Sequence, residues 1–365
     1  MSDKRLHVTE PFMPALEEFL PYLEEIWDSR VITNNGPLHQ RFEQALAEYL
    51  QVPRINLVAN GTLALVVALQ ALKIEGEVIT TPYSFVATSN ALLWNKLRPV
   101  FVDIRPDTCN LDPGLIEAAI TPDTSAILAV HTYGTPCDVA AIQKVADRHG
   151  LKVIYDAAHA FNVRLDGESL LTFGDLSTIS FHATKVFHTV EGGAIYPSRQ
   201  LLKEQVDFLK NFGFANETTV TAPGINAKMN EMSAAMGLLQ LRYADQCIAR
   251  RLAIAARYRE ALAPVDGLRT LQHGDNVRWN GAYFPVFLEA LTRDQRDAVY
   301  EAMKRDEVYG RRYFYPLLTD FPMYGGIPSA APENLPNARK IADSVICLPI
   351  YPTMTDGDVE RVIAS

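Results

Sequence analysis

The segment LSTISFHATKVFHTVEGGAI, Leu176–Ile195, decides the fold. A short strand rich in β-branched residues, Leu176–Ser180, leads into an irregular turn, and a glycine pair then opens a second strand. Lys185 lies in that turn, between two hydrophobic strands. A lysine so placed can condense with a carbonyl group if its surroundings lower its pKa. A lone lysine in a turn is more often an ordinary surface residue, so the other segments must decide between these interpretations.

Alternating strands and helices precede this segment. Short apolar runs are separated by predicted helices, among them Val86–Trp94 and Val139–His149. This pattern predicts a mostly parallel sheet that is covered on both faces. Ligands of such sheets bind at the carboxyl ends of the strands. The polar and aromatic residues expected at those ends are Asn60–Thr62, Tyr83–Phe85, Asp156 and Ser180.

The flanking segments suggest two domains. Helices are expected over Pro11–Trp27 and Leu38–Leu50, and one long helix is expected over Ser233–Leu262, with a domain boundary inside it. The remainder of the chain has the mixed strand and helix signals of a small α+β unit. We therefore expect an α/β protein with a large domain, residues 1–245, and a small C-terminal domain, residues 246–365.

Composition narrows the function classes. The 365 residues carry a net charge of −9, which argues against nucleic acid as the main partner. The N-terminus lacks the apolar stretch of an export signal, and no apolar run is long enough to span a membrane, so a cytoplasmic location is expected. Four dispersed cysteines indicate reduced thiols and give no support for zinc or an iron–sulfur cluster: Cys109, Cys137, Cys247 and Cys347.

Three residues are suited to binding an anion such as phosphate. Gly61 and Thr62 open a predicted helix, where free backbone N–H groups and a hydroxyl are available. Ser180, just before the lysine turn, adds a second hydroxyl. A Gly-Thr pair alone is more often an ordinary helix start, so this signal depends on its neighbours.

Further residues are suited to a cationic aromatic ring. Asp156 ends an apolar strand, where a poorly solvated carboxylate needs a cationic partner such as a pyridinium nitrogen. His159 is placed to donate to a phenolate oxygen, and Phe85 to lie against the ring, although a lone Phe is more often a core residue. An aspartate at a strand end, a second strand and then Lys185 is the order expected of a pyridoxal phosphate (PLP) site.

Taken together, the motifs resemble the DegT-type nucleotide-sugar aminotransferases, which are PLP enzymes of fold type I (aspartate aminotransferase-like). The resemblance covers nearly the whole chain and rests on these segments in order: VTEPFMPALEEF, TNNGP, NGTLAL, TTPYSFVAT, YDAAHAF, SFHATK, EGGAI, GINAKMNE, AAMGLLQL and LPIYPTMT. It implies that residues 1–245 bind PLP and carry an N-terminal substrate loop. YDAAHAF and SFHATKVFHTVEGGAI are most similar to the members that form dTDP-4-amino-4,6-dideoxyglucose (viosamine).

The resemblance assigns the PLP contacts residue by residue. Lys185 matches the lysine that holds PLP and shuttles the proton, and Asp156 matches the aspartate paired with the pyridine nitrogen. His159 stands near the ring oxygen, and Phe85 matches the stacked aromatic residue. The matching phosphate ligands are Gly61, Thr62 and Ser180.

The resemblance also implies a homodimer with shared active sites. Asn226 matches an asparagine that reaches the phosphate of the neighbouring subunit's PLP. Other residues match regions that line the sugar-nucleotide cleft: Asn34, His182, His188, Arg312, Tyr313 and Tyr315.

The expected reaction is transfer of an amino group from L-glutamate to a dTDP-4-keto-6-deoxyhexose. Its product would be a precursor of O-antigen or another surface glycan. The nearest alternative places the amine at C3 of a 3-keto sugar. A PLP-dependent sugar dehydratase is disfavoured, because related dehydratases replace the lysine with histidine, whereas this chain has Lys185. A regulator that merely binds PLP is a further alternative, since a fold does not fix a function.

Overall fold

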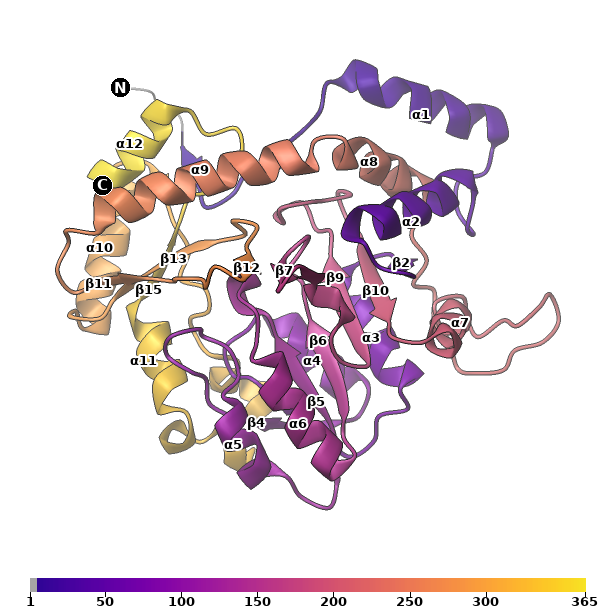
Figure 1. The fold of residues 1–365 in the computed structure, drawn as a ribbon, viewed down its shortest axis with the longest axis horizontal. Coiled ribbons are helices and arrows are strands. Elements are labelled where there is room, and N and C mark those ends of the chain that lie inside the picture. Colours follow the sequence, from indigo (N-terminus) through magenta and orange to yellow (C-terminus); the bar gives the residue numbers. More distant parts are fainter. Residues whose placement is uncertain (1–4) are drawn as a thin grey trace.

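A seven-stranded sheet lies at the centre of the larger part of the molecule, as seen in a computed structural model that describes residues 5–365 (Figure 1). The strand order is β2-β10-β9-β6-β5-β3-β4, and β10 is antiparallel to both of its neighbours while the other pairs are parallel. The expected mostly parallel sheet is therefore confirmed. Its strands are β2 (Asn56–Val58), β3 (Glu77–Thr80), β4 (Arg98–Phe101), β5 (Thr124–Val130), β6 (Lys152–Asp156), β9 (Leu176–Ser180) and β10 (Gly193–Pro197).

Helices cover both faces of this sheet because its strands bury alternate residues on opposite sides. Along β5, Ala126 and Leu128 pack with α3 and α4, whereas Ile127 and Ala129 pack with α6. The bounds predicted for α4 and α6 are those observed. The helices of this part are α2 (Pro37–Leu50), α3 (Gly61–Ala71), α4 (Val86–Trp94), α5 (Pro113–Ile116), α6 (Val139–His149) and α7 (Gln200–Leu209).

The C-terminal part is built on a three-stranded antiparallel sheet in the order β11-β13-β15. Two small sheets connect segments that are far apart in the chain: β1 pairs with β14, and β12 pairs with β7, which also pairs with β8. The strands are β1 (Leu6–His7), β7 (Arg164–Leu165), β8 (Glu168–Ser169), β11 (Leu268–Thr270), β12 (Val277–Arg278), β13 (Phe284–Leu288), β14 (Val308–Tyr309) and β15 (Val345–Leu348). The helices are α10 (Arg293–Arg305), α11 (Pro336–Ser344) and α12 (Asp356–Ala364). The division at residue 245 stays a prediction.

The prediction of one long helix over Ser233–Leu262 is wrong. Two helices, α8 (Glu231–Leu241) and α9 (Ala244–Leu262), meet at a short break. Tyr243 directly precedes α9, with φ −111° and ψ −5°, and its hydroxyl donates to Glu18 of α1 (Leu16–Ser29). The N–H groups of Arg242 and Tyr243 donate to carbonyl oxygens three residues back, so α8 ends in a tightened turn. No glycine or proline marks this position in the sequence.

Candidate active site

A cavity of about 680 Å³ opens at the carboxyl ends of β5, β6 and β9. This is the edge of a parallel sheet at which ligands bind. Nine of the residues selected from the sequence line the cavity: Gly61, Thr62, Phe85, Asp156, His159, Ser180, His182, Lys185 and Tyr313. The fold therefore brings together segments that lie far apart in the sequence.

Lys185 extends from the turn after β9 into this cavity. The turn is closed by its backbone N–H, which donates to the carbonyl oxygen of His182 at 2.9 Å. Burial lowers the pKa of the Lys185 amine from 10.5 to about 8, although the negative charge of Asp156 opposes the shift. About a tenth of the amine is thus neutral and nucleophilic at pH 7, far more than for an ordinary lysine.

Asp156 lies buried at the end of β6. One carboxylate oxygen accepts from the Thr88 hydroxyl at 2.8 Å, and the other accepts from the Ala158 N–H at 3.1 Å. Burial raises the pKa of the carboxyl, although these hydrogen bonds and the charge of Lys185 oppose the rise. Within residues 5–365, no cationic side chain forms an ion pair with Asp156. A cationic ring nitrogen placed here would supply the missing counter-charge.

The tautomer of His159 follows from its backbone contact. Its Nδ1 accepts from the N–H of Tyr133 at 3.2 Å, so that nitrogen carries no proton. Burial lowers the pKa of the ring, which is therefore neutral and carries its single proton on Nε2. His159 thus offers the cavity a hydrogen-bond donor, the role expected beside a phenolate oxygen.

Phe85 is an apolar side chain that the protein itself does not cover. It precedes α4 directly and lines the cavity, and 57% of its surface is exposed. A core phenylalanine would be buried, so Phe85 is not an ordinary core residue. Its exposed ring is suited to packing against a flat ligand.

The first turn of α3 lies against the end of β9. Asn60 caps this helix by accepting from the Leu63 N–H at 2.8 Å, which leaves the N–H groups of Gly61 and Thr62 without a side-chain cap. A Cβ atom on Gly61 would lie 2.8 Å from the Cβ of Ser180. The glycine therefore permits the helix start and the serine hydroxyl to converge, and together they are suited to a phosphate group.

We expect Gly61→Ala to weaken PLP binding about tenfold or more, because the added methyl group must push Ser180 away from the helix start. The affinity is measured by titrating cofactor-free protein with PLP and following absorbance. Gly150→Ala is the control, since a Cβ there meets nothing within 4 Å and lies outside the cavity, although its positive φ costs some stability. An unchanged affinity in Gly61→Ala would contradict the phosphate assignment.

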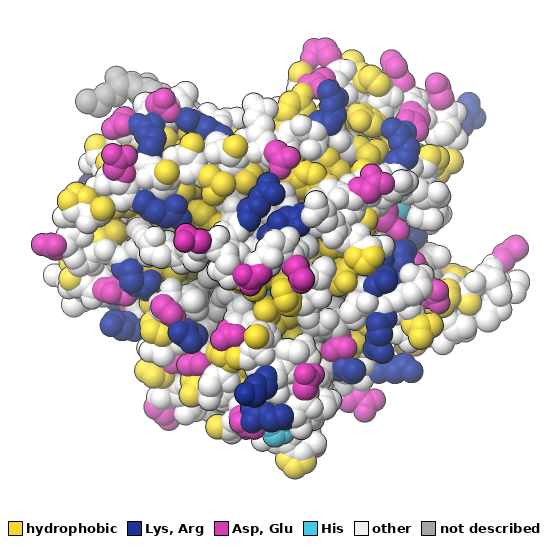
Figure 2. Space-filling view, viewed as in Figure 1, with side chains coloured by type: hydrophobic (Ala, Val, Ile, Leu, Met, Phe, Trp, Pro, Cys, Tyr) yellow, Lys and Arg dark blue, Asp and Glu magenta, His cyan; other side chains and the backbone are white. Residues whose placement is uncertain are grey.

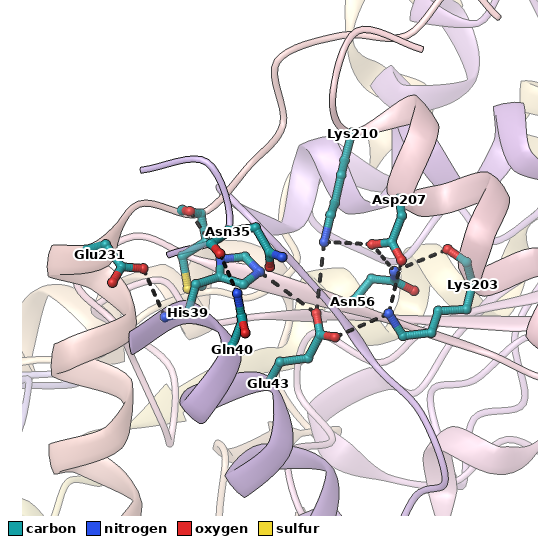
Figure 3. A network of polar contacts seen from close by, with 10 residues as sticks. Asn35, His39, Gln40, Glu43, Asn56, Lys203, Asp207, Lys210 and Glu231 are labelled. Carbon is teal, nitrogen blue, oxygen red and sulfur yellow. Dashed lines mark hydrogen bonds and ion pairs between the residues drawn. The ribbon is translucent and has the colours of Figure 1, made fainter. Parts of the chain in front are cut away.

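The loop that carries Asn34 lies outside this cavity, beside a separate polar network (Figure 3). The Glu43 carboxylate at its centre contacts His39 at 3.8 Å, Lys203 at 3.1 Å and Lys210 at 3.9 Å. Burial alone would raise the pKa of Glu43, but these neighbours lower it to about 2. Glu231 accepts from the first N–H groups of α2, and the whole cluster fixes α2, which follows the loop, to α7 and α8.

The side chains of His188 and Arg312 make their contacts outside the cavity. The buried His188 ring lies 2.9 Å from the carbonyl oxygen of Phe12, behind the lysine turn. Arg312 donates to Asp297 at 2.7 Å, and its guanidinium lies over the ring of Tyr315. None of these side chains lines the cavity.

Asn226 is exposed and lies outside the cavity of its own chain. It forms a bridge with Asn211 after α7. Its predicted role concerns a neighbouring subunit and stays a prediction.

Two residues of the site were not selected from the sequence. Thr88 holds Asp156 from the first turn of α4, one helical turn after Ser84, to which its hydroxyl also bonds at 2.8 Å. The only sequence feature that could have indicated Thr88 is its position at the end of the TTPYSFVAT segment, three residues after Phe85. Tyr283 contacts Lys185 from the C-terminal part, and no local pattern in the sequence indicates that contact.

Known proteins share both the sequence and the fold. The profile of the DegT/DnrJ/EryC1/StrS aminotransferase family matches residues 15–365. A dTDP-4-amino-4,6-dideoxy-D-glucose transaminase of Escherichia coli is 50% identical over 363 residues, covering 99% of this chain and 98% of the relative. The protein of the same name from Shigella dysenteriae is 47% identical, covering 100% and 98%. The structure of DesI in the presence of its TDP-sugar product has a TM-score of 0.93 at 37% identity, covering 100% of this chain and 92% of that one.

Proposed function

Because this chain belongs to the DegT/DnrJ/EryC1/StrS aminotransferase family, we infer that it is a PLP-dependent aminotransferase acting on a dTDP-4-keto-6-deoxyhexose. The amino donor is L-glutamate, and the product is dTDP-4-amino-4,6-dideoxyglucose. The two transaminases that match the chain along almost its full length carry that product in their names. We also propose that the product is a precursor of a surface glycan such as O-antigen.

The observation that carries this proposal is that Lys185 and Asp156 line the same cavity without forming an ion pair. The amine has a lowered pKa, and the buried carboxylate has no cationic partner among residues 5–365. A group with a carbonyl at one end and a cationic ring nitrogen at the other satisfies both residues. PLP has both features, and the residues present therefore fit it.

Each part of PLP has a candidate partner in the cavity. We propose that Asp156 pairs with the ring nitrogen, His159 donates to the ring oxygen and Phe85 covers the ring face. The phosphate is assigned to Gly61, Thr62 and Ser180. Bound PLP supplies an electron-withdrawing ring that carries the amino group from donor to acceptor.

The amine of Lys185 accepts and returns the proton in both half-reactions. With PLP bound, its neutral Nζ would accept the proton from Cα of glutamate and hold it as the ammonium until the proton is returned within the same half-reaction. The sugar half runs in the opposite direction, so the same nitrogen delivers a proton to C4 of the sugar. Asp156 stays ionised beside the ring nitrogen and keeps that nitrogen protonated.

The pH dependence of PLP capture tests the state of Lys185. Because its pKa is lowered to about 8, the neutral fraction rises about tenfold per pH unit below that value and levels off above it. We expect the rate of PLP binding to cofactor-free protein to follow this curve in stopped-flow absorbance. A rate that keeps rising to pH 10 would show an ordinary lysine instead.

Absorbance also tests the donor half-reaction. PLP-loaded protein absorbs visible light, and L-glutamate without any sugar is expected to bleach this band at a saturable rate, with release of one 2-oxoglutarate per site. D-Glutamate is the control. A protein that merely binds PLP would keep its colour, which would exclude the proposed aminotransferase.

We further propose a homodimer in which each subunit contributes Asn226 to the partner's site. In support, Asn226 lies outside its own cavity, and apolar side chains gather around the projecting α1 (Figures 1 and 2). The exposed ones on and beside α1 are Met13, Leu16, Leu20, Trp27 and Ile32. Mixing inactive Lys185→Ala subunits with weakened Asn226→Ala subunits tests whether the active sites are shared. If Asn226 acts across the interface, one site of each hybrid dimer contains both an intact Lys185 and an intact Asn226, and activity is regained. If Asn226 acts within its own subunit, neither site of the hybrid is intact.

The membrane and the cellular location are separate questions. Among residues 5–365, no helix is both long enough and apolar enough to cross a membrane. The cytoplasmic location stays a prediction from the sequence.

A further inference from the structure

Tyr283 reaches the reactive lysine from the C-terminal part of the chain. It immediately precedes β13, and its hydroxyl oxygen accepts from Lys185 Nζ at 3.5 Å. The side chain is buried, with 8% of its surface exposed, and it lines the same cavity as Lys185. In the described part of the chain, the hydroxyl has no other hydrogen-bond partner. The contact is therefore a direct link between the C-terminal part and Lys185.

The backbone that carries Tyr283 is anchored to the large part of the molecule. The amide nitrogen of Asn280 donates to the carbonyl oxygens of His159 and Phe161, each at 2.9 Å. The amide oxygen of Asn280 accepts from the Ala282 N–H at 3.0 Å. Asn280 thus ties the segment before Tyr283 to the loop that follows Asp156.

A tight turn fixes the same segment from its other side. Gly281 has a φ of +68°, and a Cβ atom there would lie 2.8 Å from the Cβ of Arg251. The guanidinium of Arg251 is buried and donates to the carbonyl oxygen of Ile350 at 2.7 Å. Only glycine permits this close approach to α9, so the position of the Tyr283 backbone is set by packing on both sides.

The ring of Tyr283 has little freedom to rotate. It lies edge-on to the His159 ring at 4.9 Å between centroids, and edge-on to the Tyr313 ring at 5.5 Å. Edge-to-face aromatic contacts of this kind favour one ring orientation. The direction of the hydroxyl toward Lys185 is therefore built into the fold.

We propose that Tyr283 is a positioning residue that holds the amine of Lys185 where it takes up and returns the reaction proton. The hydroxyl oxygen accepts one N–H of the amine, and the lone pair of the neutral amine stays free for the substrate. Tyr283 keeps its own proton throughout, because burial raises the pKa of its hydroxyl. This inference rests on the proposed function and adds a residue to the same site.

Tyr283→Phe removes the hydroxyl and keeps the ring. We expect the maximal rate of glutamate bleaching to fall about tenfold, because a misplaced proton acceptor slows transfer, while the half-saturating glutamate concentration stays unchanged. Tyr258→Phe is the matched control: this buried tyrosine does not line the cavity, and it loses a 2.8 Å hydrogen bond to the Pro349 carbonyl while keeping its ring. Equal rates in Tyr283→Phe and Tyr258→Phe would overturn the proposal.

A second measurement separates positioning from general damage. The pKa of Lys185 is measured in the full chain without cofactor by trace acetylation across pH, with mass spectrometry of the Lys185 peptide. Loss of a hydrogen-bond acceptor disfavours the ammonium, so the midpoint is expected to fall by about half a unit in Tyr283→Phe and not in Tyr258→Phe. The other titratable groups lining the cavity are unchanged in both variants: Asp156, His159, His182, Glu191 and Tyr313.

The outcomes are distinct. If Tyr283→Phe bleaches more slowly with glutamate but the acetylation midpoint of Lys185 does not shift, the loss is structural damage, and the positioning role is overturned. The acetylation experiment uses neither glutamate nor sugar, so it tests the contact even if the wild-type protein fails to transaminate. Failure of wild-type bleaching would instead contradict the proposed function.

Discussion

Lys185→Ala is expected to lower turnover by about 10⁴-fold or more. The variant loses both the nucleophile that captures PLP and the base that moves the proton, and no other amine lines the cavity in residues 5–365. PLP can still bind through the proposed phosphate and ring contacts, which do not involve this side chain. The measurement is the steady-state rate of amino-sugar formation at saturating PLP, together with the PLP content of the purified variant.

Two additions make this result specific. Lys152→Ala changes a lysine of β6 outside the cavity, whose ammonium contacts Asp175 at 3.6 Å, and should keep wild-type turnover. Adding methylamine to Lys185→Ala should restore part of the lost rate, because a small amine can accept the proton from the vacated space. Wild-type turnover in Lys185→Ala would refute the assigned chemistry.

Asp156→Asn is expected to lower the maximal bleaching rate by about 10²- to 10³-fold. The amide has nearly the same shape as the carboxylate but no charge, so it does not keep the ring nitrogen protonated. The measurement is the rate of glutamate bleaching at saturating glutamate. Asp175→Asn is the control, since Asp175 supports the opposite end of β6 by accepting from the Val153 N–H at 3.0 Å.

The stability of Asp156→Asn separates catalysis from folding. Burial raises the pKa of Asp156 in the folded chain, so the ionised carboxylate weakens folding above its unfolded pKa. Replacing it by a neutral amide removes that cost, and the cofactor-free variant should melt no lower than the wild type at pH 7. A large loss of thermal stability would attribute the lost activity to damaged structure instead.

The order of strands and helices was accessible from the sequence because each strand of the sheet is buried on both faces. Along β5, side chains pack alternately against α3 and α4 on one face and against α6 on the other, so the run Ala126–Val130 is apolar throughout. The end of β6 then follows from Asp156, the first polar residue after its apolar run. The position of the cavity follows from that end.

Contacts between distant segments were not accessible in this way. Tyr283 lies 98 residues from Lys185, and its role depends on how the segment around Gly281 packs on α9. The break between α8 and α9 is a turn at Arg242 and Tyr243 that no glycine or proline marks. Such placements are decided by tertiary packing, on which local propensity and periodicity carry no information.

The partner of a charged side chain is likewise not accessible from the local sequence, as Arg312 shows. The family resemblance assigned it to the sugar-nucleotide cleft, and its guanidinium is paired with Asp297 and packed against the ring of Tyr300. The sequence reveals the charge of a side chain but not the partner that neutralises it. Its assignment to the cleft stays a prediction.

The most direct test of the central claim is NMR of the product formed from dTDP-4-keto-6-deoxyglucose, L-glutamate and PLP-loaded protein. We predict a single product with the amine at C4 in the equatorial position, recognised by large couplings of H4 to both H3 and H5. Glutamate bleaching without any product, together with turnover of the 3-keto isomer to a C3 amine, would contradict the assigned acceptor.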